Sequence, residues 1–153
     1  MKKEVVVLGL GNRLMADEGI GSWVVERLKT LSDKYPQAEF IDAGTGGMAV
    51  LHHISGRRKA VIIDCARMRT QPGTIKKFTP ADVKSVKKLA PCCLHEVDVL
   101  RIIDLCEQLG QCPEEIVIFG IEPAGTVPGL KSSDILNSRM NDYVAAVVGE
   151  LGV

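Results

Sequence analysis

Hydrophobic positions along the chain fall into two patterns that alternate with each other. The first is the continuous apolar run rich in valine and isoleucine, which is typical of strands covered on both faces. It predicts strands over residues 4–10, 39–43, 59–64, 74–78 and 115–121. The second is an apolar stripe at helical spacing, as at Ile20, Val24, Leu28 and Leu31. It predicts helices over residues 20–31, 48–54, 80–89, 96–109 and 132–148.

The alternation of strands and helices indicates an α/β fold. We expect a three-layer sandwich in which helices cover both faces of a mostly parallel, twisted sheet of about five strands. The strand at 74–78 follows its predecessor through Gln71, Pro72 and Gly73, a gap too short for a crossover helix. An antiparallel orientation is therefore favoured for it. Thr79 and Gly110 are expected to cap two of the helices.

Size and composition point to one ordinary globular domain over residues 1–153. The formal net charge is zero, and acids and bases are interspersed, which argues against binding to nucleic acid or to an anionic membrane surface. No apolar run approaches the roughly 20 residues that span a bilayer. The apolar start is too short for a signal peptide and has no cleavage site. We expect a cytoplasmic protein, and we expect it to be a monomer.

The cysteine pattern agrees with this interpretation. The five cysteines include the adjacent pair Cys92 and Cys93, and an odd number with such a pair does not suit a secreted disulfide framework. No Cys-x-x-Cys spacing is present, which argues against a structural zinc site. Cys65 and Cys106 are predicted to be buried free thiols.

The most informative segment is the glycine-rich stretch from Gly9 to Gly21, between the first strand and the first helix. A dinucleotide-binding loop would need a third glycine where Leu14 stands. Two acids, Asp17 and Glu18, lie instead near the start of the helix, where they disfavour a phosphate and favour a cation. This loop is therefore interpreted as part of a metal-recognising site.

Other polar residues follow strands in the same way. Asp64 ends the third apolar run, His95 precedes a helix that leads to the last strand, and Asp42 ends the second run before Gly44-Thr45-Gly46-Gly47. Ligands of open α/β sheets bind beyond the carboxyl ends of the strands. Glu18, Asp64 and His95 would form an oxygen and nitrogen ligand set, which suits a borderline divalent ion such as nickel, zinc or iron. Three protein ligands would leave positions open for water or substrate.

Each of these residues also has a plainer interpretation. Asp17 and Glu18 could cap a helix and complement its dipole, which is the favoured interpretation for Asp17. Asp64 could equally be a turn former, and His95 a surface residue. The adjacent pair His52 and His53 should point in different directions on a helix.

Other sequence features point to no further site. The basic cluster at residues 57–59 is interpreted as a solvated turn. No Walker A motif or Gly-x-Ser-x-Gly elbow is present. A thiol nucleophile at Cys92 or Cys93 has no independent support.

Five segments in order resemble the nickel–iron hydrogenase maturation endopeptidases. The first and most specific is Val7-Leu-Gly-Leu-Gly-Asn-Arg-Leu-Met-Ala-Asp-Glu-Gly-Ile-Gly21. The others are Asp42-Ala-Gly-Thr-Gly-Gly-Met48, Ile62-Ile-Asp-Cys-Ala66, Leu94-His-Glu96 and Phe119-Gly-Ile-Glu-Pro123. Two departures from the family pattern are Cys93, where Ser or Thr is common, and Glu122, where Gln is common.

The resemblance implies an endopeptidase that removes the C-terminal extension of a hydrogenase large-subunit precursor after nickel insertion. Carried over by position, Glu18, Asp64 and His95 would act as catalytic and metal-binding residues that recognise nickel supplied by the precursor, although another divalent metal could bind the isolated protein. Asp42, Gly44, Thr45 and Gly46 would contact the substrate tail. Two alternatives stay open: a non-catalytic nickel-sensing chaperone of the same precursor, and an unrelated small-molecule α/β hydrolase.

Overall fold

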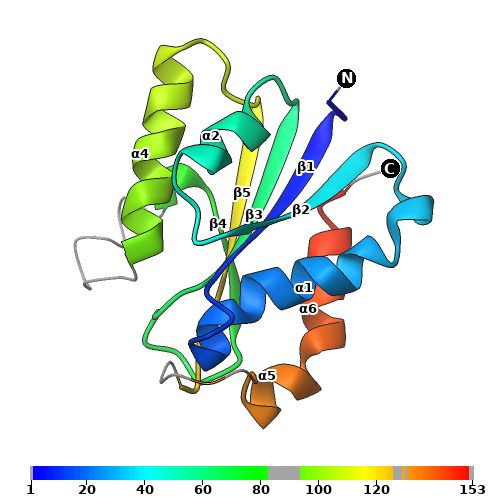
Figure 1. The fold of residues 1–153 in the computed structure, drawn as a ribbon, viewed down its shortest axis with the longest axis vertical. Coiled ribbons are helices and arrows are strands. Elements are labelled where there is room, and N and C mark those ends of the chain that lie inside the picture. Colours follow the sequence, from blue (N-terminus) through cyan, green and yellow to red (C-terminus); the bar gives the residue numbers. More distant parts are fainter. Residues whose placement is uncertain (1, 83–93, 126–128, 130, 152–153) are drawn as a thin grey trace.

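The computed structural model describes residues 2–82, 94–125, 129 and 131–151, and the side chains of residues 94–98 lie outside this description. Within these ranges, five strands form one sheet in the order β2-β1-β3-β5-β4 (Figure 1). They are β1 (Val5–Leu10), β2 (Ala38–Gly44), β3 (Lys59–Cys65), β4 (Ile75–Phe78) and β5 (Glu115–Ile121). Neighbouring strands pair in parallel except β4, which is antiparallel to β5. The predicted strands and the exceptional orientation of β4 are confirmed.

Helices occur in each of the predicted segments, although their bounds differ in places. The described helices are η1 (Ala16–Gly19), α1 (Ile20–Lys29), η2 (Ser32–Lys34), α2 (Met48–Ile54), α4 (Leu94–Gln108), α5 (Asp134–Ser138) and α6 (Met140–Val148). The prediction of a single helix over 132–148 is wrong. The chain leaves helical geometry at Arg139 (φ −102°, ψ 6°), so two helices, α5 and α6, form instead. Of the helix predicted over 80–89, residues 80–82 are helical and 83–89 lie outside the described residues.

Both predicted caps are confirmed. The Thr79 hydroxyl accepts a hydrogen bond from the Asp82 N–H at 3.2 Å, and the Asp82 carboxylate accepts one from the Thr79 N–H at 3.0 Å. This reciprocal pair satisfies backbone donors at the start of a helix. Gly110 follows α4 with a φ of 68°, a conformation that glycine adopts without strain. Cys65 and Cys106 are buried, as predicted.

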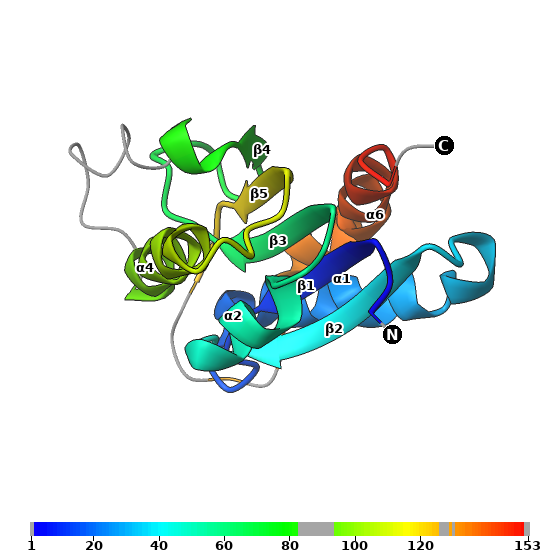
Figure 2. The same cartoon turned by 90° about the horizontal axis from the view of Figure 1, so that it is seen from above.

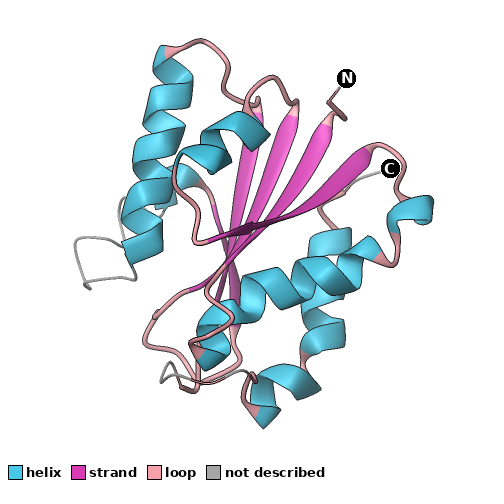
Figure 3. Ribbon diagram, viewed as in Figure 1, coloured by secondary structure: helices cyan, strands magenta, loops and turns pink. Residues whose placement is uncertain are grey.

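Side chains of the central strands alternate between two hydrophobic layers. Val5 and Val7 of β1 face a cluster built with α1 and α6, whereas Val6 and Leu8 face a cluster built with α2 and α4. These four side chains are fully buried. Figures 2 and 3 show the helices on the two sides of the sheet. The three-layer α/β sandwich is therefore confirmed.

The connections after β1 and β3 lead to opposite faces of the sheet. From β1 the chain passes through η1 into α1 on one face, whereas from β3 it passes through β4 to α4 on the other face. The carboxyl ends of these two adjacent strands therefore form a topological switch point, where open α/β sheets bind ligands. None of the helices in the described ranges combines the length and apolar character needed to cross a membrane.

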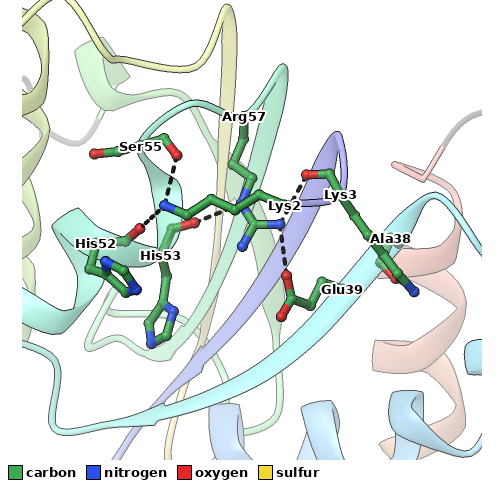
Figure 4. A network of polar contacts seen from close by, with 8 residues as sticks. All are labelled: Lys2, Lys3, Ala38, Glu39, His52, His53, Ser55 and Arg57. Atoms are coloured by element: carbon green, nitrogen blue, oxygen red, sulfur yellow. Dashed lines mark hydrogen bonds and ion pairs between the residues drawn. The ribbon is translucent and has the colours of Figure 1, made fainter.

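The amino end of the sheet, opposite the switch point, carries buried cationic side chains that bind several partners. Arg57 is 5% exposed and donates hydrogen bonds to the carbonyls of His53 and Lys3, both at 2.9 Å (Figure 4). Its guanidinium also pairs with Glu39 at 2.8 Å. Lys59, which begins β3, is 8% exposed. The interpretation of residues 57–59 as a solvated turn is therefore wrong for Arg57 and Lys59. Polar partners elsewhere in the chain allow these two side chains to be buried.

The histidine pair lies close to this network. The ring centroids of His52 and His53 are 5.5 Å apart in an edge-to-face arrangement. Burial, with the nearby His52 and Arg57, lowers the pKa of His53. His52 is exposed and His53 is half-buried, as expected for a partly exposed pair.

Candidate active site

Two of the predicted ligands come from elements that contact each other at the switch point. Asp64 lies near the end of β3, and its side chain is buried at 4% exposure. One carboxylate oxygen accepts a hydrogen bond from the Cys65 N–H at 2.8 Å. Glu18 lies in η1, which contacts β3, and its side chain is partly exposed. The sequence prediction that both acids lie at this edge of the sheet therefore agrees with the structure.

Glycines bring η1 and the start of α1 close to the strands. A Cβ atom at Gly11 would lie 2.2 Å from the carbonyl oxygen of Glu18. That carbonyl accepts a hydrogen bond from the Asn12 N–H at 3.2 Å, and the Glu18 N–H donates to the Met15 carbonyl at 3.1 Å. The turn carrying Glu18 is thus folded back onto the end of β1, in contacts that a larger residue at position 11 would prevent.

The third predicted ligand, His95, lies in the first turn of α4. Figure 1 shows the start of α4 directed toward the end of the sheet where β5 finishes. The side chain of His95 lies outside the described part of the chain. Among the described side chains, no three of the types His, Cys, Asp or Glu are grouped so that they could hold a metal ion. The complete three-residue set stays a prediction.

Asp42, predicted to contact substrate, lies in a network of polar contacts at the end of β2. One carboxylate oxygen accepts hydrogen bonds from the Ser22 hydroxyl at 2.7 Å and the Gly44 N–H at 3.0 Å. The other accepts one from Arg13 at 2.9 Å, and Arg13 also pairs with Glu26 at 2.7 Å. Burial opposes ionisation, but these three hydrogen bonds outweigh it and lower the pKa of Asp42. Asp42 therefore shapes the loop that follows it.

That loop, residues 44–47, carries the other predicted substrate contacts. Gly44, Gly46 and Gly47 all have positive φ, at 58°, 90° and 78°, and Thr45 between them is exposed. The Gly44 carbonyl accepts a hydrogen bond from the Gly11 N–H at 2.7 Å, which joins this loop to the first glycine-rich loop. Gly46 and Gly44 are partly exposed, so the loop presents backbone groups beside the switch point. Their contact with a substrate stays a prediction.

Residues 23–150 match the family model described as hydrogenase maturation protease. The chain belongs to this family. Hydrogenase expression/formation protein HoxM of Cupriavidus necator is 30% identical over 119 residues, which cover 78% of this chain and 59% of that protein. This chain therefore spans less than two-thirds of the length of HoxM. Hydrogenase 2 maturation protease of Escherichia coli is 26% identical over 155 residues, which cover 97% of this chain and 93% of that protein.

A solved structure is similar to nearly the whole of this chain. The solution structure of an endopeptidase from Escherichia coli is 26% identical, with a TM-score of 0.82, and the match covers 97% of this chain and 91% of that one. The shared fold therefore extends over almost the whole of this chain.

In this maturation protease family member, Asp17 has a role that sequence reasoning missed. Its side chain is fully buried and does not cap its own helix, so the favoured capping interpretation is wrong. Its carboxylate instead accepts hydrogen bonds from backbone N–H groups of Ala124 at 2.8 Å, Gly125 at 3.0 Å and Ser133 at 2.6 Å. The sequence contained no signal for these donors, which lie far along the chain.

Glu122, the departure from the family pattern, organises the loop after Asp64. One of its carboxylate oxygens accepts hydrogen bonds from the Met68 N–H at 2.7 Å, the Thr70 N–H at 3.0 Å and the Thr70 hydroxyl at 3.1 Å. Arg69 in this loop has a φ of 61°, and Ala16 beside Asp17 has a φ of 51°. Such strained residues persist only where surrounding contacts hold them, and they cluster at functional sites.

Proposed function

We propose that this chain is an endopeptidase that removes the C-terminal extension of a nickel–iron hydrogenase large-subunit precursor after nickel insertion. Membership of the hydrogenase maturation protease family supports the reaction class. The observation that carries the proposal is the contact between the turn bearing Glu18 and strand β3, which carries buried Asp64 near its end, at a switch point where substrates of such folds bind.

Nickel enters this proposal as part of the substrate. Glu18 and Asp64 offer carboxylate oxygens and His95 offers an imidazole nitrogen, a donor set that suits a borderline divalent ion. Asp64 fits such a role because a carboxylate that is 4% exposed is costly to keep charged, and a cation beside it offsets that cost. Other divalent metals would bind the same donors in the isolated protein.

The residues of the chain would act by holding and orienting the precursor. Nickel bound in the precursor would polarise the scissile carbonyl or lower the pKa of a water molecule. Glu18, Asp64 and His95 would dock this ion, and thereby place the adjoining peptide bond at the switch point. The backbone of residues 44–47 would contact the tail. Because docking requires the ion, precursor without nickel would not be cut.

The test is the intact mass of a cognate large-subunit precursor after incubation with this protein. The precursor is prepared with and without nickel, and its nickel content is measured before use. Wild-type protein is compared with the variants Glu18→Gln, Asp64→Asn and His95→Ala. Glu115→Gln is the matched control, because it removes the charge of an exposed carboxylate at the amino end of the sheet, away from the proposed site. Circular dichroism establishes that every variant is folded.

We expect loss of a C-terminal fragment only from nickel-loaded precursor, at the wild-type rate with Glu115→Gln. Removing one of several docking groups should lower kcat/KM by about a hundredfold or more. An unchanged mass with verified nickel-loaded precursor would overturn the endopeptidase function. Equal cleavage of precursor without nickel would overturn the role of the ion, and wild-type rates for all three variants would overturn the assignment of the site.

A further inference from the structure

The buried carboxylate of Asp17 lies next to Glu18 in the chain and contacts residues that follow β5. Its side chain has no exposed surface, and both oxygens accept hydrogen bonds from the segment that follows β5. Hydrogen bonds to a charged acceptor are about twice as strong as those between neutral groups. The hydrogen bonds to the Asp17 carboxylate therefore join two loops that are distant in the sequence, and they do so strongly.

Backbone contacts extend this connection on both sides of Asp17. The Asp17 N–H donates to the Gly125 carbonyl at 3.2 Å, and the Ala16 N–H donates to the Gly129 carbonyl at 2.9 Å. The Gly129 N–H in turn donates to the Leu14 carbonyl at 2.9 Å. Residues 14–17 are thus held by backbone hydrogen bonds to Gly125 and Gly129. Ala16, whose backbone is in the left-handed conformation, lies among these contacts.

We propose that Asp17 is a positioning residue that sets where Glu18 meets the substrate. Its carboxylate fixes the 3-10 turn of residues 16–19 against Ala124, Gly125 and Ser133, and the turn direction at Ala16 then places Glu18 toward the end of β3. The inference rests on the proposed function, because it assigns to Glu18 the task of contacting the nickel-loaded precursor. It adds the backbone N–H groups of Ala124, Gly125 and Ser133 to the groups that position Glu18.

A role for Asp17 in proton transfer conflicts with its surroundings. The carboxylate has no exposed surface, and three backbone N–H donors occupy its two oxygens. A general base must come within hydrogen-bond reach of the proton that it takes. Asp17 would have to give up its contacts to do so, and the turn that carries Glu18 would then lose its support.

The chain offers variants that alter this connection from either side. Asp17→Asn keeps one acceptor oxygen but turns an NH2 group toward backbone donors. Ser133→Pro leaves Asp17 intact and removes one donor, and the Ser133 φ of −64° already suits proline. Ser133→Ala is the matched control, because it keeps the N–H while removing a hydroxyl that makes no capping hydrogen bond.

Two measurements are made on folded protein well below its melting temperature. The first is kcat and KM for cleavage of nickel-loaded precursor. Misplacement of a docking group by a fraction of an ångström should lower kcat by about tenfold or more in Asp17→Asn and Ser133→Pro, with KM changed by less than about threefold. Ser133→Ala should cleave at the wild-type rate. The second is amide hydrogen exchange at Asn12 and Glu18, with Val7 in β1 as the reference.

We expect faster exchange at Asn12 and Glu18 in Asp17→Asn and Ser133→Pro, and unchanged exchange at Val7. Wild-type cleavage by both folded variants would overturn the inference and leave Asp17 as a stabilising residue only. Loss of cleavage in Asp17→Asn alone would also overturn it, since the carboxylate would then act by itself. If wild-type protein cleaves no precursor, the proposed function fails, and unchanged exchange at Glu18 would separately overturn the positioning role.

Discussion

The first turn of α1 lies so close to two strands that residue 21 has no room for a side chain. A Cβ atom at Gly21 would lie 2.1 Å from the carbonyl oxygen of Leu10 and 2.3 Å from that of Ile63. These are backbone atoms of β1 and β3, which cannot rotate away as a side chain can. Gly21→Ala should therefore lower the free energy of unfolding by about 3 kcal/mol, even though alanine favours helices.

Urea unfolding followed by the fluorescence of Trp23, the single tryptophan, measures this change. Gly149→Ala is the control, because Gly149 has helical φ and ψ of −59° and −23° and the nearest atom to an added Cβ is 3.4 Å away. Its unfolding free energy should change by no more than about 0.5 kcal/mol. Equal destabilisation by the two substitutions would contradict the close-contact explanation.

At the scale of single residues, sequence reasoning succeeded where the signal was local. Asp64 directly follows an apolar run, and Glu18 follows a glycine-rich turn, so the edge of the sheet on which they lie could be predicted. The donors to Asp17 are 107 to 116 residues away in the chain, and no local pattern reports them. The burial of Arg57 and Lys59 was missed for the same reason, because a charged residue is buried only where distant partners exist.

At the scale of elements, the spacing of hydrophobic residues predicted which segments form strands and helices. It did not predict where the last helical segment is interrupted. The stripe over 132–148 continues through the break at Arg139, so it predicted one helix. The break lies beside the turn at Gly73, where an added Cβ would be 3.2 Å from Arg139 and 3.3 Å from Ile135. A contact between segments more than sixty residues apart in the numbering is not encoded in a local period.

Tyr143 of α6 joins the two short helices to this turn. Its hydroxyl donates a buried hydrogen bond to the Gly73 carbonyl at 2.7 Å, and burial chiefly raises its pKa to about 12. Tyr143→Phe would leave that carbonyl without this donor, so the free energy of unfolding should fall by about 1–2 kcal/mol. Thermal unfolding of Tyr143→Phe and of Tyr35→Phe, which packs against the same core, tests this. An equal effect in both would refute a specific contribution from the hydrogen bond.

At the scale of the whole molecule, the two ends of the sheet carry different kinds of polar group. The carboxyl end holds the glycine-rich loops, the proposed docking groups and the strained residues Ala16 and Arg69. The amino end holds buried cations with their partners, such as Lys59, whose ammonium pairs with Glu150 at 3.2 Å and with Glu115 at 3.3 Å. Changes at the amino end should therefore alter stability and leave the proposed cleavage unchanged.

Glu150 tests this separation because it joins the segment after α6 to two strands. It binds Lys59 of β3 and, at 3.1 Å, Lys77 of β4. Burial opposes its ionisation, but hydrogen bonds from Lys77 and Lys59 outweigh burial and lower the pKa of Glu150 below its usual 4.5. A carboxyl group with a lowered pKa stabilises the fold above its unfolded pKa, and this contribution disappears as pH falls through the folded value.

Glu150→Gln should therefore lower the free energy of unfolding by about 1–2 kcal/mol at neutral pH. The difference from wild type should shrink as pH falls below about 4.5, because protonation removes the same charge from the wild-type protein. Urea unfolding across this range measures it, with Glu115→Gln as control, since that side chain is 54% exposed and its pair should contribute less than about 1 kcal/mol. A difference that persists in acid would refute the electrostatic origin, and slower precursor cleavage by folded Glu150→Gln would refute the separation of the two ends.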